Sequence, residues 1–210
     1  MAKSMYLSEI LATECPQLVG TGERTNLVLD TNFFNFDVIG AEEYDLIITS
    51  GVVDELWRHQ NVIPSTYARE LIRAPSTQIF DHNILREDKL IIKGAVKEYA
   101  ARLLANGKSL GEGKTFRKNG LMGDVDDQQV SCLMEMARGG ENVILISSDG
   151  DLSGTVEILK EQLDYMRDHA AVVSLRKYIE RPYEKCLEGH KGLYRKELKK
   201  LIAEPYLIAA

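Results

Sequence analysis

Short apolar runs alternate with longer segments of helical spacing along this chain. The runs that suit buried strands are residues 27–29, 46–49, 89–93, 143–147 and 171–175. Apolar spacing and start signals predict helices over residues 4–13, 52–60, 64–73, 95–105, 126–138 and 153–168, with a helical tail beyond them. Residues 107–123 hold five glycines and no periodicity, so we expect a loop there.

This alternation predicts an α/β fold, in which a central parallel sheet lies between two layers of helices. We expect residues 25–175 to form this three-layer domain, with helical extensions over 1–24 and 176–210. A length of 210 residues suits one domain rather than two. In open parallel sheets the ligand site lies beyond the carboxyl ends of the strands. The residues that follow each strand are therefore the first candidates for function.

Acidic residues occupy several of these positions. Asp30 ends the first strand, Glu55 lies early in the helix after the second, and Asp149 and Asp151 follow the run at 143–147. A further group opens the predicted helix at 126–138, namely Asp124, Asp126 and Asp127. Carboxylates gathered at one edge repel one another unless cations separate them. Their oxygen atoms suit Mg²⁺ or Mn²⁺, which can bridge to a phosphate.

Each acid also has a structural explanation. Aspartate is common after strands and at helix N-caps. Asp126 or Asp127 could cap its helix, and Asp149 could form a turn with Gly150. The occurrence of acids at successive strand ends, rather than any single one, indicates a site.

Four ordered motifs resemble those of the PIN-like nuclease family. They are LVLDTN at 27–32, TSGVVDEL at 49–56, DVDDQQVSCLMEMA at 124–137 and NVILISSDGDL at 142–152. The first resembles the family's strand closed by Asp-Thr-Asn, and the second its helix that carries a glutamate. The third resembles an aspartate that opens an apolar-faced helix, and the fourth a buried strand before Ser-x-Asp. The resemblance covers roughly residues 25–175, and the related NYN-type organisation remains an alternative.

The resemblance implies a metal-dependent nuclease with one or two Mg²⁺ or Mn²⁺ ions. By position, the catalytic metal-binding acids would be Asp30, Glu55, Asp127 and Asp149. Asp126 fits the third motif as well as Asp127 does, and Asp124 could contribute. Asp151 would be an additional ligand or a turn residue. Asn32 and Ser147 would be the polar residues that support the site.

The net charge of −6 neither requires nor excludes a nucleic-acid substrate. A basic segment precedes the acidic helix start, and we expect Lys114, Arg117 and Lys118 in it to contact phosphates. A solvated loop is the alternative explanation. GEGKT at 111–115 lacks the first glycine and the preceding strand of a P-loop, which argues against an ATPase.

The sequence thus predicts a metal-dependent endonuclease, and the family favours single-stranded RNA as its substrate. The alternatives are a flap-cleaving DNA nuclease and a catalytically silent nucleic-acid-binding module on the same fold. An antitoxin or a second copy of the chain is a possible partner. Three widely spaced cysteines predict a reduced, cytoplasmic protein, and residues 1–15 show no signal peptide or membrane anchor.

Overall fold

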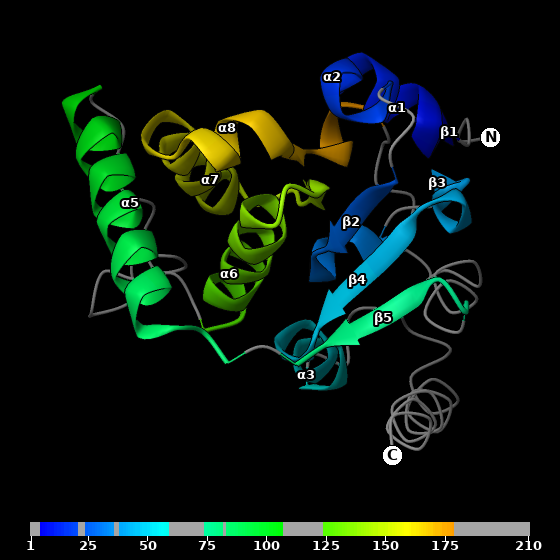
Figure 1. Cartoon of the computed structure of the whole chain (residues 1–210), viewed down its shortest axis with the longest axis horizontal. Coiled ribbons are helices and arrows are strands. Elements are labelled where there is room, and N and C mark those ends of the chain that lie inside the picture. The colour runs from blue at the N-terminus through cyan, green and yellow to red at the C-terminus, as the bar shows by residue number, and fades with distance from the viewer. Residues whose placement is uncertain are drawn as a thin grey trace, which may run out of the picture.

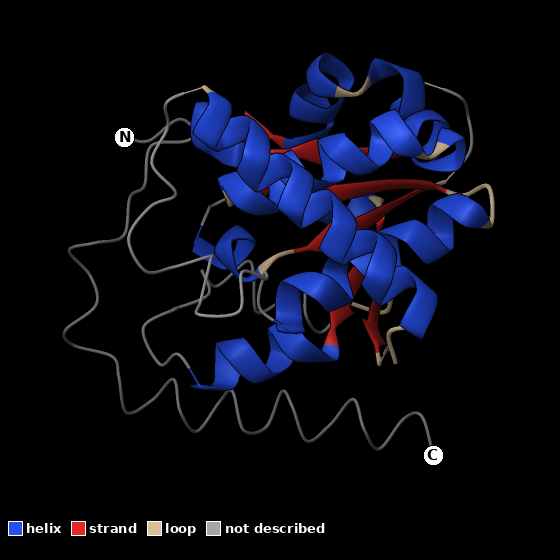
Figure 2. Ribbon diagram, turned by 90° about the vertical axis from the view of Figure 1, so that its left-hand side faces the viewer, coloured by secondary structure: helices blue, strands red, loops and turns tan. Residues whose placement is uncertain are grey.

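The computed structural model describes residues 5–20, 24–35, 38–58, 74–81, 83–106 and 124–178. Its central sheet has five parallel strands in the order β5-β4-β2-β6-β7. They are β2 (Thr25–Leu29), β4 (Asp45–Thr49), β5 (Thr77–Phe80), β6 (Asn142–Ile146) and β7 (Ala170–Val173). The strands lie between helices (Figure 2). The predicted three-layer α/β class with a parallel sheet is confirmed.

Helices connect these strands and enclose the sheet. The longer ones are α1 (Leu7–Glu14), α3 (Ser50–Arg58), α5 (Arg86–Ala105), α6 (Asp124–Arg138) and α7 (Gly150–Gln162). The shorter ones are α2 (Pro16–Val19), α8 (Asp164–His169) and the 3₁₀ turns η1 (Thr31–Asn35), η2 (Ala41–Glu43) and η3 (Leu175–Lys177). A separate parallel pair joins β1 (Met5–Tyr6) to β3 (Val38–Ile39).

Two apolar cores cover the two faces of the sheet. Along β2, Leu27 and Leu29 point into one core and Val28 into the other, because side chains alternate along a strand. The first core also takes residues of α1, α2, η1 and α3, and the second takes residues of α5, α6, α7 and α8. Figure 1 shows α5 to α8 grouped on one side of the sheet. Both faces of the central strands are thus covered by apolar residues, so a polar side chain on either face needs an explanation.

The segment before residue 25 packs against the same sheet. The Leu18 carbonyl accepts hydrogen bonds from Thr25 Oγ1 at 3.1 Å and from Asn142 Nδ2 at 3.3 Å. Glu14 accepts from Lys177 Nζ at 3.2 Å and from the Tyr178 hydroxyl. These bonds join the start of the described chain to its end, and α1 and α2 bury their apolar residues in the first core.

The prediction of a strand at residues 89–93 is wrong, because these residues lie inside α5. Leu90 is 62% exposed, whereas Ile92, Ala95 and Val96 are buried at helical spacing. The short apolar run is therefore one turn of an amphipathic helix. The strand nearest to this point of the chain is β5, an edge strand of four residues with no clear apolar run, of which Gln78 is exposed and the other three are partly buried.

Other differences concern boundaries. The helix predicted over 153–168 is divided into α7 and α8, separated by Leu163 in an extended conformation. The helix predicted at 64–73, the loop at 107–123 and the tail beyond residue 178 lie outside the described residues. Within the described part of the chain, no helix is both long enough and apolar enough to cross a membrane.

Candidate functional site

Three polar residues extend the central strands at their carboxyl ends. Asp30, Thr49 and Ser147 each follow, or end, an apolar run, and all three are buried. The register of β2 with β4 and with β6 places them level with one another. Strand alternation points them toward the second core, which α6 covers. The sheet therefore ends, on this face, in a buried polar row.

Asp30 is the centre of this row, with 4% of its surface exposed. Its Oδ2 accepts hydrogen bonds from Ser147 Oγ at 2.7 Å and Asn32 Nδ2 at 3.0 Å. Its Oδ1 accepts from Gln129 Nε2 of α6 at 3.2 Å. The three donors come from three parts of the fold, and all are neutral. The carboxylate is thus held in place without a cationic side chain among these partners.

Ser147 connects Asp30 to Asp149. The Ser147 hydroxyl donates to Asp30 and accepts from the backbone N–H of Asp149 at 3.0 Å. Asp149 is the N-cap of α7, since its Oδ1 accepts from the N–H groups of Asp151 at 2.8 Å and Leu152 at 3.4 Å. The capping role foreseen as an alternative is therefore present. Both capping bonds use Oδ1, so Oδ2 is not engaged by the cap.

Glu55 is tied to the residue that follows Asp30. Thr31 Oγ1 donates to Glu55 Oε2 at 2.7 Å, and both residues are half-buried. Thr31 opens η1, whose turn begins with the Phe33 N–H donating to the Asp30 carbonyl. The first two motifs thus meet through a hydroxyl–carboxylate bond that anchors α3 beside the end of β2.

Asp127 lies apart from this network. It is 7% exposed, and burial raises the pKa of its carboxyl to about 6, with Lys89 opposing the rise and Asp124 adding to it. Lys89 belongs to α5, so a cation of that helix lies near enough to Asp127 to lower its pKa. Asp126 precedes Gln129 by three residues and shares its side of the helix. The helix geometry therefore places Asp126, rather than Asp127, on the side of α6 that reaches Asp30.

Tyr99 of α5 contacts the start of α7. The Tyr99 hydroxyl donates to the Gly150 carbonyl at 3.2 Å, and its ring occupies the space beside Gly154, where a Cβ would lie 2.1 Å from it. Burial raises the pKa of Tyr99, and the carboxylates of Asp151 and Asp149 raise it further. Only glycine fits at position 154, and Tyr99 stays protonated as a donor to the α7 turn.

Of the predicted site residues, the structure brings together the side chains of Asp30, Asn32 and Ser147. Asp149 joins them through its backbone N–H, and Glu55 is bonded to Thr31, the residue after Asp30. Among the residues that the structure describes, no three Asp, Glu, His or Cys side chains form a group that could hold one metal ion. Lys114, Arg117 and Lys118 lie outside the described residues.

Sequence reasoning missed Gln129 and Thr31. The sequence does hold a signal for Gln129. It is a polar residue three positions after Asp126, and the turns of the helix that follow it, beginning at Val130, are largely apolar. Thr31 was part of a quoted motif, but its partner 24 residues later depends on tertiary packing.

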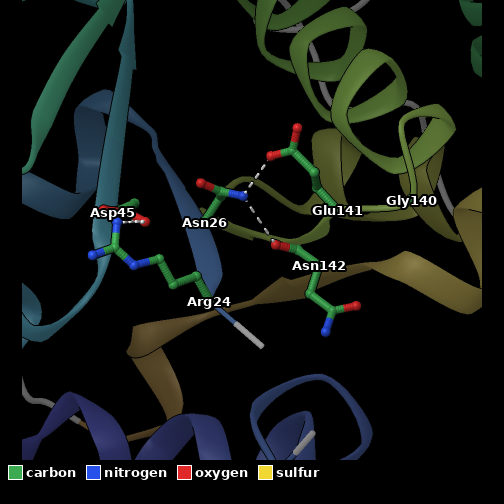
Figure 3. A pocket seen from close by; sticks show the side chains of 6 residues that line it. All are labelled: Arg24, Asn26, Asp45, Gly140, Glu141 and Asn142. Carbon is green, nitrogen blue, oxygen red and sulfur yellow. Dashed lines mark hydrogen bonds and ion pairs between the residues drawn. The ribbon is translucent and has the colours of Figure 1, made fainter. Parts of the chain in front are cut away.

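A shallow pocket lies at the opposite, amino-terminal edge of the sheet (Figure 3). Arg24 pairs there with Asp45 at 3.3 Å, and Asn26 Nδ2 donates to Glu141 Oε2 at 3.0 Å. The residues that line it are Arg24, Asn26, Asp45, Gly140, Glu141 and Asn142. Their polar groups are largely engaged with one another, and Arg24 is 88% exposed at its side chain.

No family model, curated protein or solved structure matches this chain. The assignment to the PIN-like family therefore stays a prediction that rests on the four motifs and their order.

Proposed function

We propose that the protein is a divalent-metal-dependent endonuclease that hydrolyses phosphodiester bonds in single-stranded RNA. The observation that carries the proposal is the buried carboxylate of Asp30, held by neutral donors at the carboxyl end of the central strand. Asp149 is attached to it through Ser147, and Glu55 through Thr31. In parallel α/β sheets this edge is where ligands bind.

The chemistry of the donors fits Mg²⁺ or Mn²⁺. Carboxylate and hydroxyl oxygens are the ligands that these ions take, and Mg²⁺ keeps several waters while using only one or two carboxylates directly. A site of that kind does not need three acids in contact, and the described residues contain no group of three. Asp30 and Asp149 would hold the ion, and Glu55 and Asp126 would act through its waters. A bound ion would polarise the scissile phosphate and activate water.

Other residues of the chain would hold these acids in fixed orientations. Asn32, Ser147 and Gln129 orient Asp30, the α7 cap orients Asp149, and Thr31 orients Glu55. Such fixed geometry reduces the reorganisation needed to reach the transition state. The buried Asp127, with its pKa near 6, would be a structural acid of the α5–α6 packing.

The test is incubation of the full chain with labelled single-stranded RNA, single-stranded DNA and branched DNA, in Mn²⁺, Mg²⁺ or EDTA. We expect cleavage of the RNA that requires metal. Preference for branched DNA would favour the flap-type nuclease. Metal-independent binding without cleavage would identify a silent nucleic-acid-binding module and contradict the proposal.

The predicted basic segment adds a second measurement. Replacing Lys114, Arg117 and Lys118 with alanine should lower the slope of log affinity against log salt by roughly one unit per lost phosphate contact. An unchanged slope would show that these residues do not contact the substrate.

A further inference from the structure

Gln129 is an unusual residue for its position in α6. It is fully buried, its Nε2 donates to Asp30 Oδ1 at 3.2 Å, and its Oε1 has no hydrogen-bond partner among the described residues. The Thr49 hydroxyl, which is level with Asp30 on the next strand, is likewise buried without a partner there. The row of polar residues at the sheet end thus contains two polar atoms that stabilise nothing by hydrogen bonding.

A buried amide with an unpaired oxygen is unfavourable for folding. An apolar side chain of similar length would bury equal surface at this position without leaving an acceptor unpaired. Apolar packing of α6 therefore does not explain the glutamine. Its one productive contact is the bond to Asp30, which requires the nitrogen to face the carboxylate, because an ionised carboxylate only accepts.

This bond has a specific geometric effect on Asp30. Asn32 and Ser147 both donate to Oδ2, so they oppose rotation about the last side-chain torsion, which has no sharp rotamer preference, at one oxygen only. Gln129 alone, among the described residues, donates to Oδ1. Three donors on two oxygens define the plane of the group and direct its remaining lone pair.

We propose that Gln129 is a positioning residue that sets the plane of the Asp30 carboxylate. Its consequence for metal binding rests on the function proposed above, whereas the contact itself does not. Because partners of this kind typically change metal affinity 10–100-fold, we expect its loss to weaken Mn²⁺ binding about tenfold.

The test compares Gln129→Met with Gln128→Met, the same change one residue away. Gln128 Oε1 accepts from the Gly51 N–H at 2.9 Å and does not contact Asp30, so its replacement disturbs the same helix turn without touching the carboxylate. The first measurement is the carboxyl-carbon NMR resonance of Asp30 in the metal-free protein at fixed pH. We expect Gln129→Met to move this resonance and Gln128→Met to leave it in place.

The second measurement is Mn²⁺ binding by calorimetry. An about tenfold loss in Gln129→Met, with wild-type binding in Gln128→Met, supports the proposal. If Gln129→Met does not fold, Gln129→Asn replaces it, since the shorter amide cannot reach Asp30. An unmoved Asp30 resonance together with unchanged Mn²⁺ binding overturns the positioning role, even if the enzyme cuts RNA. A moved resonance in a protein that binds no Mn²⁺ keeps the positioning role and overturns the nuclease function instead.

Discussion

The two edges of the central sheet carry similar side chains in different surroundings. At the amino-terminal edge, Asp45 is partly exposed and pairs with Arg24, which is itself 88% exposed at its side chain. At the carboxyl edge, Asp30 is buried and is held by neutral donors from three elements. Both are aspartates at the ends of neighbouring parallel strands, so residue type alone does not distinguish them.

The difference lies in burial and in the sign of the partners. An exposed ion pair is screened by water and contributes about 0–1 kcal/mol. A buried carboxylate has lost its hydration and needs every hydrogen bond that it receives. Where those bonds come from neutral groups, the negative charge remains available to a cation from outside. The charges at the amino-terminal edge are therefore screened by water and by each other. The buried charge of Asp30 at the carboxyl edge can attract a cation.

The largest effect is expected from removing charge at the carboxyl edge. Asp149→Asn keeps an N-cap side chain for α7 but loses the charge, so we expect RNA cleavage to fall by roughly 10²-fold or more, since metal-linked stabilisation of the transition state is worth several kcal/mol. Asp30→Asn should abolish cleavage too. It should also lower the free energy of unfolding by about 1–3 kcal/mol, because its amide group would face donors.

The matched control is Asp45→Asn, which makes the same change at the opposite edge of the sheet, where Asp45 begins β4. It should leave cleavage rates at the wild-type level. Equal losses in Asp45→Asn and Asp149→Asn, measured under the same single-turnover conditions, would remove the functional distinction between the edges.

A buried carboxylate that does have a cationic partner provides the next test. Asp88 of α5 is 2% exposed and accepts from Arg138 of α6 at 2.6 Å. Arg138 also lies over the Tyr165 ring, 5.4 Å from its centre. Arg138→Met should lower the free energy of unfolding by about 3 kcal/mol, because it leaves a buried charge unpaired; the 42% exposure of Arg138 keeps the loss at the lower end of the usual range. Urea denaturation measures it, and a loss below 0.5 kcal/mol would contradict this account.

Asp127 gives a pH-dependent test at the start of the same helix. Its folded pKa, about 6, lies above the ordinary value of 3.8 for an aspartate, chiefly through burial and despite Lys89. The folded state therefore binds the proton more tightly, and its stability should fall as pH rises from about 4 to about 6. Asp127→Asn should match wild type near pH 4 and exceed it by about 2–3 kcal/mol at pH 8 in EDTA.

Thermal melts of both proteins across this range, with and without Mn²⁺, check the prediction. If Asp127→Asn reduces the stabilisation gained from Mn²⁺, Asp127 is a ligand and Asp126 is not the third acid of the site. Equal pH profiles for mutant and wild type would show that burial does not shift Asp127.

The smallest effect is expected at the amino edge. Arg24→Ala breaks the exposed pair with Asp45, and we expect a loss of no more than about 1 kcal/mol in the free energy of unfolding. Added salt should reduce even this difference, since it screens exposed charges. A loss that is large and insensitive to salt would mean that the two edges are more alike than their burial indicates.

The sequence by itself determined the fold class and the candidate edge. The apolar runs in β2, β4 and β6 are local patterns, and the acids after them were visible without any structure. Local pattern was insufficient at residues 89–93, where a run of three apolar residues suits a strand or a helix equally well. The side of α5 that faces the core includes Asp88, which is buried because it pairs with Arg138, fifty residues later in the chain. This pairing exists only once α5 and α6 have packed together.

The tertiary structure alone decided which polar groups meet. Gln129 reaches Asp30 across 99 residues, Ser147 reaches it across 117, and Asp127 is buried although Asp126 beside it in the chain is only partly buried. Adjacent helical residues point about 100° apart, so the packing angle of α6 selects which of them approaches the sheet. Periodicity is written along the chain and can be predicted from it. The approach of two distant side chains depends on the dense packing of every element between them, which no local pattern contains.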